Sequence, residues 1–263
     1  MIDIHSHILP GIDDGSTDLQ QSLESLKKIA ESGTRRLYLT SHFFKGHYEY
    51  SRAEYDKKFN ELKSAMEAAG ISLELKPGFE VFLQMGAWDD IRRESLFMGD
   101  SRYVLFESDL NGLPPDLYGT IYPVLRMGAK PILAHAERYV SIMKRPSEIK
   151  NLISRNVYVQ VNAASFMGFY GAKVKDTAYR LLEEGWVHFI ASDDHARGSY
   201  DTFPNAFTWI EEHLDRRTAE LLMQEFPSRI ESGEDIPYTY VKVMHHHRSH
   251  SRRKKSFLAK IFG

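Results

Sequence analysis

The sequence predicts an α/β fold in which short parallel strands alternate with helices and close into a β/α barrel. Seven short apolar runs have the composition of buried strands, at residues 1–4, 36–40, 72–76, 103–106, 131–134, 157–161 and 186–191. Segments with helical periodicity separate these runs. Several of these segments end in a glycine just before the next run, where a left-handed residue commonly ends a helix: Gly33, Gly70, Gly128 and Gly185.

The polar residues that follow the apolar runs give the spacing of the repeats. They are His5, His42, Glu80, Glu107, His135, Asn162 and Asp193, separated by 37, 38, 27, 28, 27 and 31 residues. Each interval is long enough for a strand and a crossover helix. An open doubly wound sheet would also place ligands at the carboxyl ends of its strands, but it has no closed rim on which so many strands converge. We therefore favour the barrel, whose active site would lie at that rim.

The first helix is expected at residues 17–32, because Thr17 and Gln20 have the spacing of a capping box ahead of an apolar stripe. The last helices are expected at residues 207–213 and 216–226. The composition changes after residue 237. We therefore expect a barrel domain over residues 1–237 and a basic, flexible tail over residues 238–263.

Composition narrows the class of protein. The chain has 263 residues, of which 42% are hydrophobic, enough for one substantial core. The formal net charge is −2, but residues 245–263 hold six bases and no acid, so residues 1–244 carry 28 bases against 36 acids. This acidic body argues against nucleic-acid binding.

The chain contains no cysteine, which excludes disulfides, thiolate metal sites and cysteine nucleophiles. We expect a cytoplasmic protein. No apolar run approaches the roughly 18 residues of a membrane span. Strand-like sequence begins at Met1, so we also expect no removable signal peptide.

Imidazole and carboxylate side chains dominate the expected strand ends. A single histidine in such a place is more often a hydrogen-bonded polar residue than a ligand. So many titratable groups buried together would be costly without cations, which favours a polynuclear site for Zn, Mn or Fe. Asp14 could add a ligand from the first loop, although it and Asp13 could also be acids at a helix N-terminus. The candidate ligands are His5, His7, Asp14, His42, Glu80, Glu107, His135, Asp193 and His195.

The motifs around these residues resemble a known family. They are Asp3-Ile-His-Ser-His7, Leu9-Pro-Gly-Ile-Asp-Asp-Gly15, Thr40-Ser-His42, Gly78-Phe-Glu80, Ala134-His-Ala-Glu-Arg-Tyr139 and Ala191-Ser-Asp-Asp-His195. In this order they resemble the polymerase and histidinol phosphatase (PHP) family, and within it the bacterial protein-tyrosine phosphatases of the CpsB/YwqE type. The resemblance covers residues 1 to about 230.

The resemblance implies a distorted seven-stranded barrel that binds three divalent metal ions, with manganese expected first and iron or zinc as alternatives. By motif position, the first ion would be held by His5, His7, Glu80 and Asp193. The second would be held by Glu80, Glu107 and His135. The third would be held by Asp14, His42 and His195.

The implied reaction is hydrolysis of phosphotyrosine by metal-activated water. Arg138 matches the arginine that binds the substrate phosphate, although it could instead form a rim salt bridge with Glu137. Tyr200 stands where a second arginine is usual, and Arg197 is the nearest base that could replace it. Asp194 could carry a proton or be a solvated turn carboxylate.

The resemblance also implies a partner, the phosphotyrosine-bearing tail of a membrane-associated bacterial tyrosine kinase that regulates capsule or exopolysaccharide synthesis. The basic C-terminal tail could make peripheral membrane contact or could simply be disordered and solubilising. Three other functions stay open: a small-molecule phosphatase acting on histidinol phosphate or on a sugar or nucleotide phosphate, a metal-dependent exonuclease module, and an inactive metal-binding scaffold. Four aromatic residues could line a pocket for an aryl phosphoester or could be packing: Phe43, Phe44, Tyr48 and Tyr50.

Overall fold

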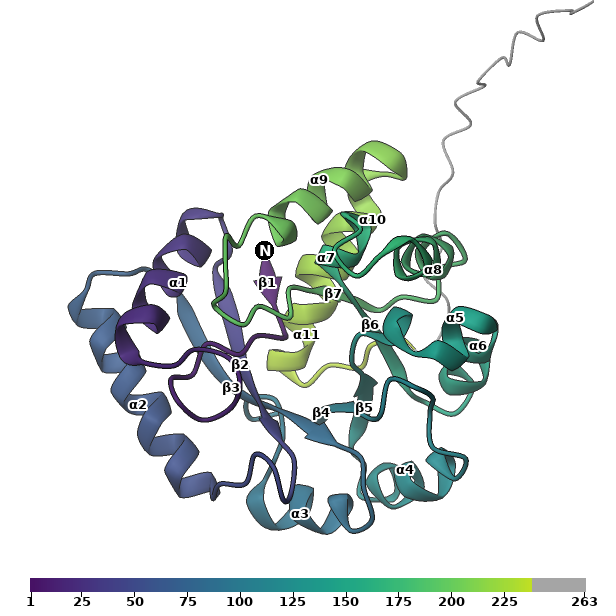
Figure 1. The fold of residues 1–263 in the computed structure, drawn as a ribbon, viewed down its shortest axis with the longest axis horizontal. Coiled ribbons are helices and arrows are strands. Elements are labelled where there is room, and N and C mark those ends of the chain that lie inside the picture. Colours follow the sequence, from purple (N-terminus) through teal and green to yellow (C-terminus); the bar gives the residue numbers. More distant parts are fainter. Residues whose placement is uncertain (238–263) are drawn as a thin grey trace, which may run out of the picture.

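The computed structural model describes residues 1–237, which form a barrel of seven parallel strands with helices around it (Figure 1). The strands are β1 (Ile2–Asp3), β2 (Arg36–Phe43), β3 (Glu74–Phe82), β4 (Tyr103–Glu107), β5 (Lys130–Leu133), β6 (Tyr158–Asn162) and β7 (Phe189–Ala191). Their order in the sheet is their order in the sequence. A doubly wound sheet reverses its strand order at a switch point. The predicted seven-stranded barrel is therefore confirmed, and the open sheet is wrong.

Hydrogen bonds between the first and last strand segments close the barrel at its carboxyl end. The amide of Asp193 donates to the carbonyl of His5 at 2.9 Å, and the amide of His7 donates to the carbonyl of Asp194 at 2.7 Å. All four residues belong to the motifs that carry the expected ligands. Closure of the barrel and assembly of the site therefore use the same segments.

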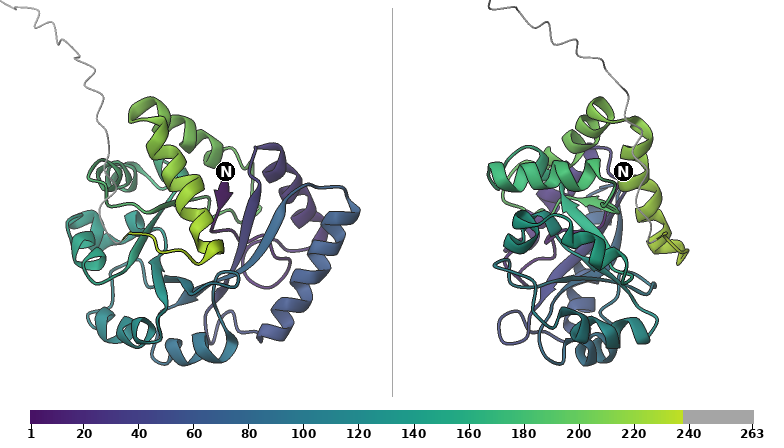
Figure 2. Two further views of the ribbon diagram at one scale, coloured as in Figure 1. Left: turned by 180° about the vertical axis from the view of Figure 1, so that it is seen from behind. Right: turned by 90° about the vertical axis from the view of Figure 1, so that its right-hand side faces the viewer.

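The helices lie outside the strands, which are buried on both sides, as expected of a covered parallel sheet. They are α1 (Leu19–Glu31), α2 (Arg52–Ala68), α3 (Ala87–Glu94), α4 (Leu117–Arg126), the 3-10 turn η1 (Ala136–Arg138), α5 (Val140–Lys144), α6 (Glu148–Ile153), α7 (Ala163–Phe166), α8 (Ala172–Glu183), α9 (Thr202–His213), α10 (Arg216–Glu220), the π-helical turn η2 (Leu221–Glu225) and α11 (Phe226–Ser232). Figure 2 shows α11 beside β1 when the molecule is seen from behind. Within residues 1–237, no helix has the length and apolar character needed to cross a membrane.

The helix boundaries differ from the expected ones in three places, and one of them is the helix expected at 207–213, which begins at Thr202. Asp18, rather than Thr17, caps α1, and its carboxylate accepts a hydrogen bond from the amide of Gln21 at 2.9 Å. A charged oxygen is a stronger acceptor than a hydroxyl. At the other end of the chain, the expected helix at 216–226 continues to Ser232, because a π-helical turn precedes Pro227 and accommodates its missing N–H.

Strand β3 runs six residues past its expected end, through Pro77 and Gly78 to Phe82. A Cβ atom on Gly78 would lie 2.9 Å from the Cγ2 atom of Thr40, so only glycine lets β2 and β3 approach so closely there. The hydroxyl of Tyr55 lies 3.2 Å from the amide of Gly78 and accepts its hydrogen bond. The extension brings Glu80 into register with His42.

The four glycines expected to end helices all have positive φ angles, 84° at Gly33, 68° at Gly70, 73° at Gly128 and 72° at Gly185. This prediction is confirmed. The basic tail predicted at 238–263 lies outside the described residues.

Candidate metal centre and active site

The nine candidate ligands lie together at the carboxyl end of the barrel. They come from seven different segments: the ends of β1 to β5, the loop after β1 and the loop after β7. Three groups of them have ligand atoms within 4.8 Å of one another: His5, His7 and Asp193; His42, Glu80 and Glu107; and His7, Asp14, His42 and His195.

His5 and His7 face each other with their Nε2 atoms 3.1 Å apart, and both rings are fully buried. The Nδ1 atom of His5 donates to Gln160 at 3.1 Å, and that of His7 donates to Asp13 at 2.8 Å. In the neutral form of each ring the proton lies on Nδ1, and the Nε2 atom then carries a lone pair. This is how histidine is presented to a metal ion, and the two lone pairs would repel each other without a cation between them.

Glu80 and Asp193 bring negative charge to this histidine pair. Oε2 of Glu80 lies 3.1 Å from Nε2 of His5 and 3.3 Å from Nε2 of His7, and Oδ1 of Asp193 lies 3.4 Å from each. Burial alone would lower the pKa of His5, but the charges of Glu80 and Asp193 outweigh it and raise that pKa to about 9. The field of the site therefore favours a positive charge at this point.

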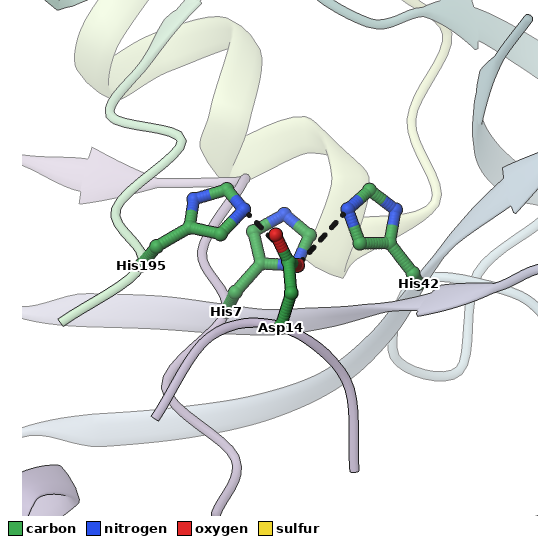
Figure 3. Close-up of side chains that lie close together, drawn as sticks. All are labelled: His7, Asp14, His42 and His195. Carbon is green, nitrogen blue, oxygen red and sulfur yellow. Dashed lines mark ion pairs between the residues drawn. The ribbon is translucent and has the colours of Figure 1, made fainter. Parts of the chain in front are cut away.

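Asp14, His42 and His195 form a second convergence with His7 (Figure 3). Oδ1 of Asp14 lies 3.5 Å from Nε2 of His42 and 3.4 Å from Nε2 of His195. This oxygen is buried and has no hydrogen-bond partner. The Nδ1 atom of His195 donates to the carbonyl of Asp193 at 2.9 Å, so its Nε2 atom is again the free acceptor.

Glu80, Glu107 and His135 meet on the other side of the barrel mouth. Nε2 of His135 lies 2.9 Å from Oε1 of Glu80 and 3.6 Å from Oε2 of Glu107. His42 also reaches this group, because its Nδ1 atom is 3.2 Å from Glu80 and 3.1 Å from Glu107. Glu80 thus contacts both the His5/His7 pair and His135. His42 contacts Glu80 and Glu107, which the resemblance assigns to the second ion, although it assigns His42 to the third.

Two of the ligands sit on strained backbone. His135 has a φ angle of 34° and Asp193 one of 57°, values that non-glycine residues rarely adopt. Each residue stands just after the end of its strand. The left-handed conformation turns the chain sharply, and strain of this kind is typical of functional sites.

The donor set fits divalent metal ions. Two ligands that each lie about 2.1 Å from one ion at a tetrahedral angle are about 3.4 Å apart. Most nitrogen–oxygen separations described above lie between 3.1 and 3.6 Å. The facing Nε2 atoms of His5 and His7 and the unpartnered oxygen of Asp14 are polar atoms that a cation would satisfy.

Arg138 projects from η1 into the same pocket. Its Nη1 atom lies 3.3 Å from Oδ2 of Asp193, and its guanidinium carbon lies 4.5 Å from the centre of the Tyr170 ring. Glu137, the alternative partner for a rim salt bridge, is fully buried instead and accepts hydrogen bonds from Ser165 and from the amide of Asn162. The structure therefore places Arg138 beside the candidate ligands and not in a pair with Glu137.

Three residues after β7 that line the pocket differ in their burial and in their hydrogen-bond partners. Asp194 is half-buried in its wall, and burial, aided by the charge of Asp3, raises its pKa to about 6. Arg197 is exposed and donates to the carbonyl and carboxylate of Asp14. Tyr200, at the position of the usual second arginine, is buried and donates to Asp3 at 2.6 Å, which ties it to the barrel wall.

Sequence reasoning placed Asn162 at a strand end but missed Gln160 and the buried chain of amides that the two form behind the ligands. Oε1 of Gln160 accepts from His5 and from the amide of His135 at 2.8 Å, and its Nε2 atom donates to Asn162 at 2.8 Å. Asn162 in turn donates to Asp193 at 2.7 Å. These two residues alternate along β6 and face the mouth, a period-two signal that could have identified them. They orient three ligands from one strand.

The pocket around the candidate ligands has a volume of about 560 Å³, a size typical of small-ligand sites. The aromatic residues that line it are Phe169, Tyr170 and Tyr200, and not the four aromatics suggested from the sequence. Among those, Phe43 is buried against Tyr50, and Phe44 stacks on Phe82. The packing alternative therefore holds for them. Tyr48 stacks on His42 without lining the pocket.

Comparison with known proteins shows that nearly the whole described part of the chain matches one protein family. Residues 1–231 match the family model described as capsular polysaccharide synthesis, CpsB/CapC. The tyrosine-protein phosphatase YwqE of Bacillus subtilis is 31% identical over 196 residues, which are 74% of this chain and 77% of the relative. The tyrosine-protein phosphatase CpsB of Streptococcus pneumoniae is 28% identical over 237 residues, or 88% and 98% of the two chains.

Solved structures agree with this match. One similar structure comes from work on YwqE from Bacillus subtilis and CpsB from Streptococcus pneumoniae, which are described as unique metal-dependent tyrosine phosphatases. It has a TM-score of 0.84 at 28% identity, and the match covers 92% of this chain and 100% of that one. Histidinol phosphate phosphatase from Lactococcus lactis has a TM-score of 0.54 at 10% identity over 84% and 95% of the two chains, and so shares the fold. The resemblance inferred from the motifs is confirmed.

Proposed function

Since this chain belongs to the CpsB/CapC family of capsular polysaccharide synthesis proteins, we propose that it is a metal-dependent protein-tyrosine phosphatase. The observation that carries this proposal is the pair of buried imidazoles whose Nε2 atoms face each other at 3.1 Å beside Asp193, with Arg138 at the edge of the same site. Its relatives named tyrosine-protein phosphatase support the substrate class.

Three divalent ions would be held by the nine converging ligands, and manganese, iron and zinc all suit such nitrogen and oxygen donors. His5, His7 and Asp193, with Glu80, would hold the first. The second would be held by Glu80, Glu107 and His135, and the third by Asp14, His42 and His195. His42 contacts ligands of both of these ions, because one of its nitrogens lies near Asp14 and the other near Glu107. When bound, such ions would neutralise the phosphate dianion and supply hydroxide near neutral pH by lowering the pKa of water.

The side chains around the ions would direct the hydrolysis. The guanidinium of Arg138 would donate two parallel hydrogen bonds to phosphate oxygens, orienting phosphorus for in-line attack. As the bond between phosphorus and the tyrosine oxygen breaks, Asp194 would donate a proton to that oxygen, because its carboxyl lines the pocket beside Asp193. Arg197 would approach the phosphate from the other side, where it now pairs with Asp14. The products are inorganic phosphate and tyrosine.

The physiological substrate in this proposal is the phosphotyrosine-bearing tail of a membrane-associated kinase in capsule or exopolysaccharide synthesis, and the protein acts in the cytoplasm. The capsular family supports this context, and the absence of cysteine suits a reducing compartment. Deleting residues 245–263 should weaken salt-sensitive co-sedimentation with anionic vesicles or with the kinase. Unchanged binding would remove the tail from the proposal.

The experiment that tests the function compares substrates. Purified protein supplied with manganese, iron or zinc should hydrolyse a phosphotyrosyl peptide, with much lower kcat/KM on histidinol phosphate and no cleavage of single-stranded DNA. A preference for histidinol phosphate would favour a small-molecule phosphatase. Cleavage of DNA would favour the exonuclease alternative, which the acidic body disfavours.

A further inference from the structure

The loop between α7 and α8 places two adjacent aromatic side chains at the mouth of the pocket. Phe169 is 72% exposed and Tyr170 is 37% exposed, and both line the pocket that contains Arg138 and the candidate ligands. Single exposed aromatics on an open surface are common. An exposed ring in the wall of a charged pocket is different, because its apolar surface is available to whatever enters.

The backbone holds this aromatic tip in one shape. Gly168 and Gly171 flank the pair with φ angles of 83° and 91°, a conformation that glycine adopts without strain. The amide of Phe169 donates to the carbonyl of Ala164 at 3.2 Å, and the amide of Gly171 donates to the carbonyl of Gly168 at 3.0 Å. Because these bonds are formed in the free protein, a ligand would pay little to order the loop.

The two rings have different neighbours. Tyr170 lies under the guanidinium of Arg138, 4.5 Å from its central carbon, while Arg138 also pairs with Asp193 at 3.3 Å. Tyr170 thereby supports the group that faces the phosphate position. Phe169 is the more exposed ring, and Leu110 and Ala164 add apolar surface to the same pocket.

The pocket therefore has a charged floor and an apolar rim. A phosphotyrosine has a dianionic end and an aromatic end, and only in one orientation does each end meet the matching part of the pocket. Resting on the proposed function, we propose that Phe169 stacks on the phenyl ring of the substrate and makes the site select aryl over alkyl phosphate monoesters. Offset or edge-to-face ring pairs of this kind give a modest but specific gain in affinity.

Two variants separate ring stacking from general apolar contact. Phe169→Leu removes the ring and keeps an apolar side chain, while Phe169→Trp keeps an aromatic face. Neither changes a candidate ligand, and the exposed position makes loss of folding unexpected. Tyr122→Leu is the matched control, because Tyr122 is 61% exposed on α4 and does not line the pocket.

The measurement is calorimetric binding of phenylphosphonate and methylphosphonate to manganese-loaded protein, since neither compound can be hydrolysed. Wild-type protein should prefer phenylphosphonate, and Phe169→Leu should reduce that preference about threefold to tenfold. Phe169→Trp and Tyr122→Leu should retain it. An unchanged preference in Phe169→Leu, or no preference in the wild type, would overturn the stacking role. Failure of the proposed function is distinguishable, because wild-type protein would then not hydrolyse a phosphotyrosyl peptide with any of the three metals.

Discussion

The Oδ2 atom of Asp13 accepts a hydrogen bond from Nδ1 of His7 at 2.8 Å and another from the amide of His42 at 2.9 Å. Asp13 therefore fixes the ring of one candidate ligand and the backbone of another without facing the centre itself. Burial would raise the pKa of Asp13, but the charge of His7 outweighs it and lowers that pKa to about 2. The carboxylate of Asp13 is thus ionised beside the protonated ring of His7.

Asp13→Asn should weaken metal binding about tenfold to a hundredfold, because a carboxylate behind a ligating histidine fixes its tautomer and raises its basicity. Phosphatase activity should fall with it and recover at higher metal concentration. Titration of the metal-free protein with manganese, followed by calorimetry and by turnover, measures both effects. Asp56→Asn, which alters a partly exposed carboxylate paired with Arg52, is the control. Wild-type affinity in Asp13→Asn would show that Asp13 does not tune His7.

Arg138→Lys should lower kcat/KM for a phosphotyrosyl peptide about tenfold to a hundredfold while the metal content stays at the wild-type level. Lysine keeps the charge but loses the planar pair of donors that matches a phosphate. Steady-state kinetics and metal analysis of the same preparation separate the two readouts. Arg145→Lys, at a side chain that is 76% exposed, should change neither. Loss of metal in Arg138→Lys would instead indicate that Arg138 acts by holding Asp193.

His188 should make the fold sensitive to acid. Its ring is buried at the opposite end of β7 from the site, and burial lowers its pKa to about 3, against about 6.5 when unfolded. Between these values the unfolded chain binds the extra proton, so the free energy of unfolding falls as pH decreases. From pH 7 to pH 5 this one group should remove about 2 kcal/mol.

His188→Asn tests this linkage, since the asparagine oxygen can replace Nδ1 as the acceptor for the amide of Val159 but cannot titrate. Urea unfolding at pH 7 and pH 5 should show a smaller pH-dependent loss in the variant than in the wild type. His213→Asn, at an exposed ring on α9, should behave like the wild type. Equal losses in all three proteins would mean that His188 takes up no proton on unfolding.

The strand ends and the barrel could be predicted because the relevant signals are local. A parallel strand buried on both faces is a short apolar run, and a polar residue after it stands at the rim. The nine converging side chains were found in this way. The caps of the helices were less predictable: Asp18 accepts from the amide of Gln21, whereas Thr17 donates its own amide to the side chain of Gln21.

Other features depend on contacts between distant segments. Gln160 looks like an ordinary strand residue, and Asn162 like one more polar strand end, until the barrel places them behind His5 and Asp193. Phe169 lies far from the ligand motifs in sequence, so the aromatic wall was sought near His42 instead. The contact of Tyr200 became clear only from the structure, because no local signal shows that its hydroxyl donates to the distant Asp3.

The most direct test of the metal centre is the metal dependence of turnover in wild-type protein and in Glu80→Gln. We predict that chelation abolishes hydrolysis of a phosphotyrosyl peptide, that added manganese restores it with about three ions bound per chain, and that Glu80→Gln loses both metal and activity. Glu80 is fully buried and contacts His5, His7, His42 and His135, so its substitution alters contacts to four candidate ligands at once. Full activity in the chelated wild type, or in Glu80→Gln, would contradict the account.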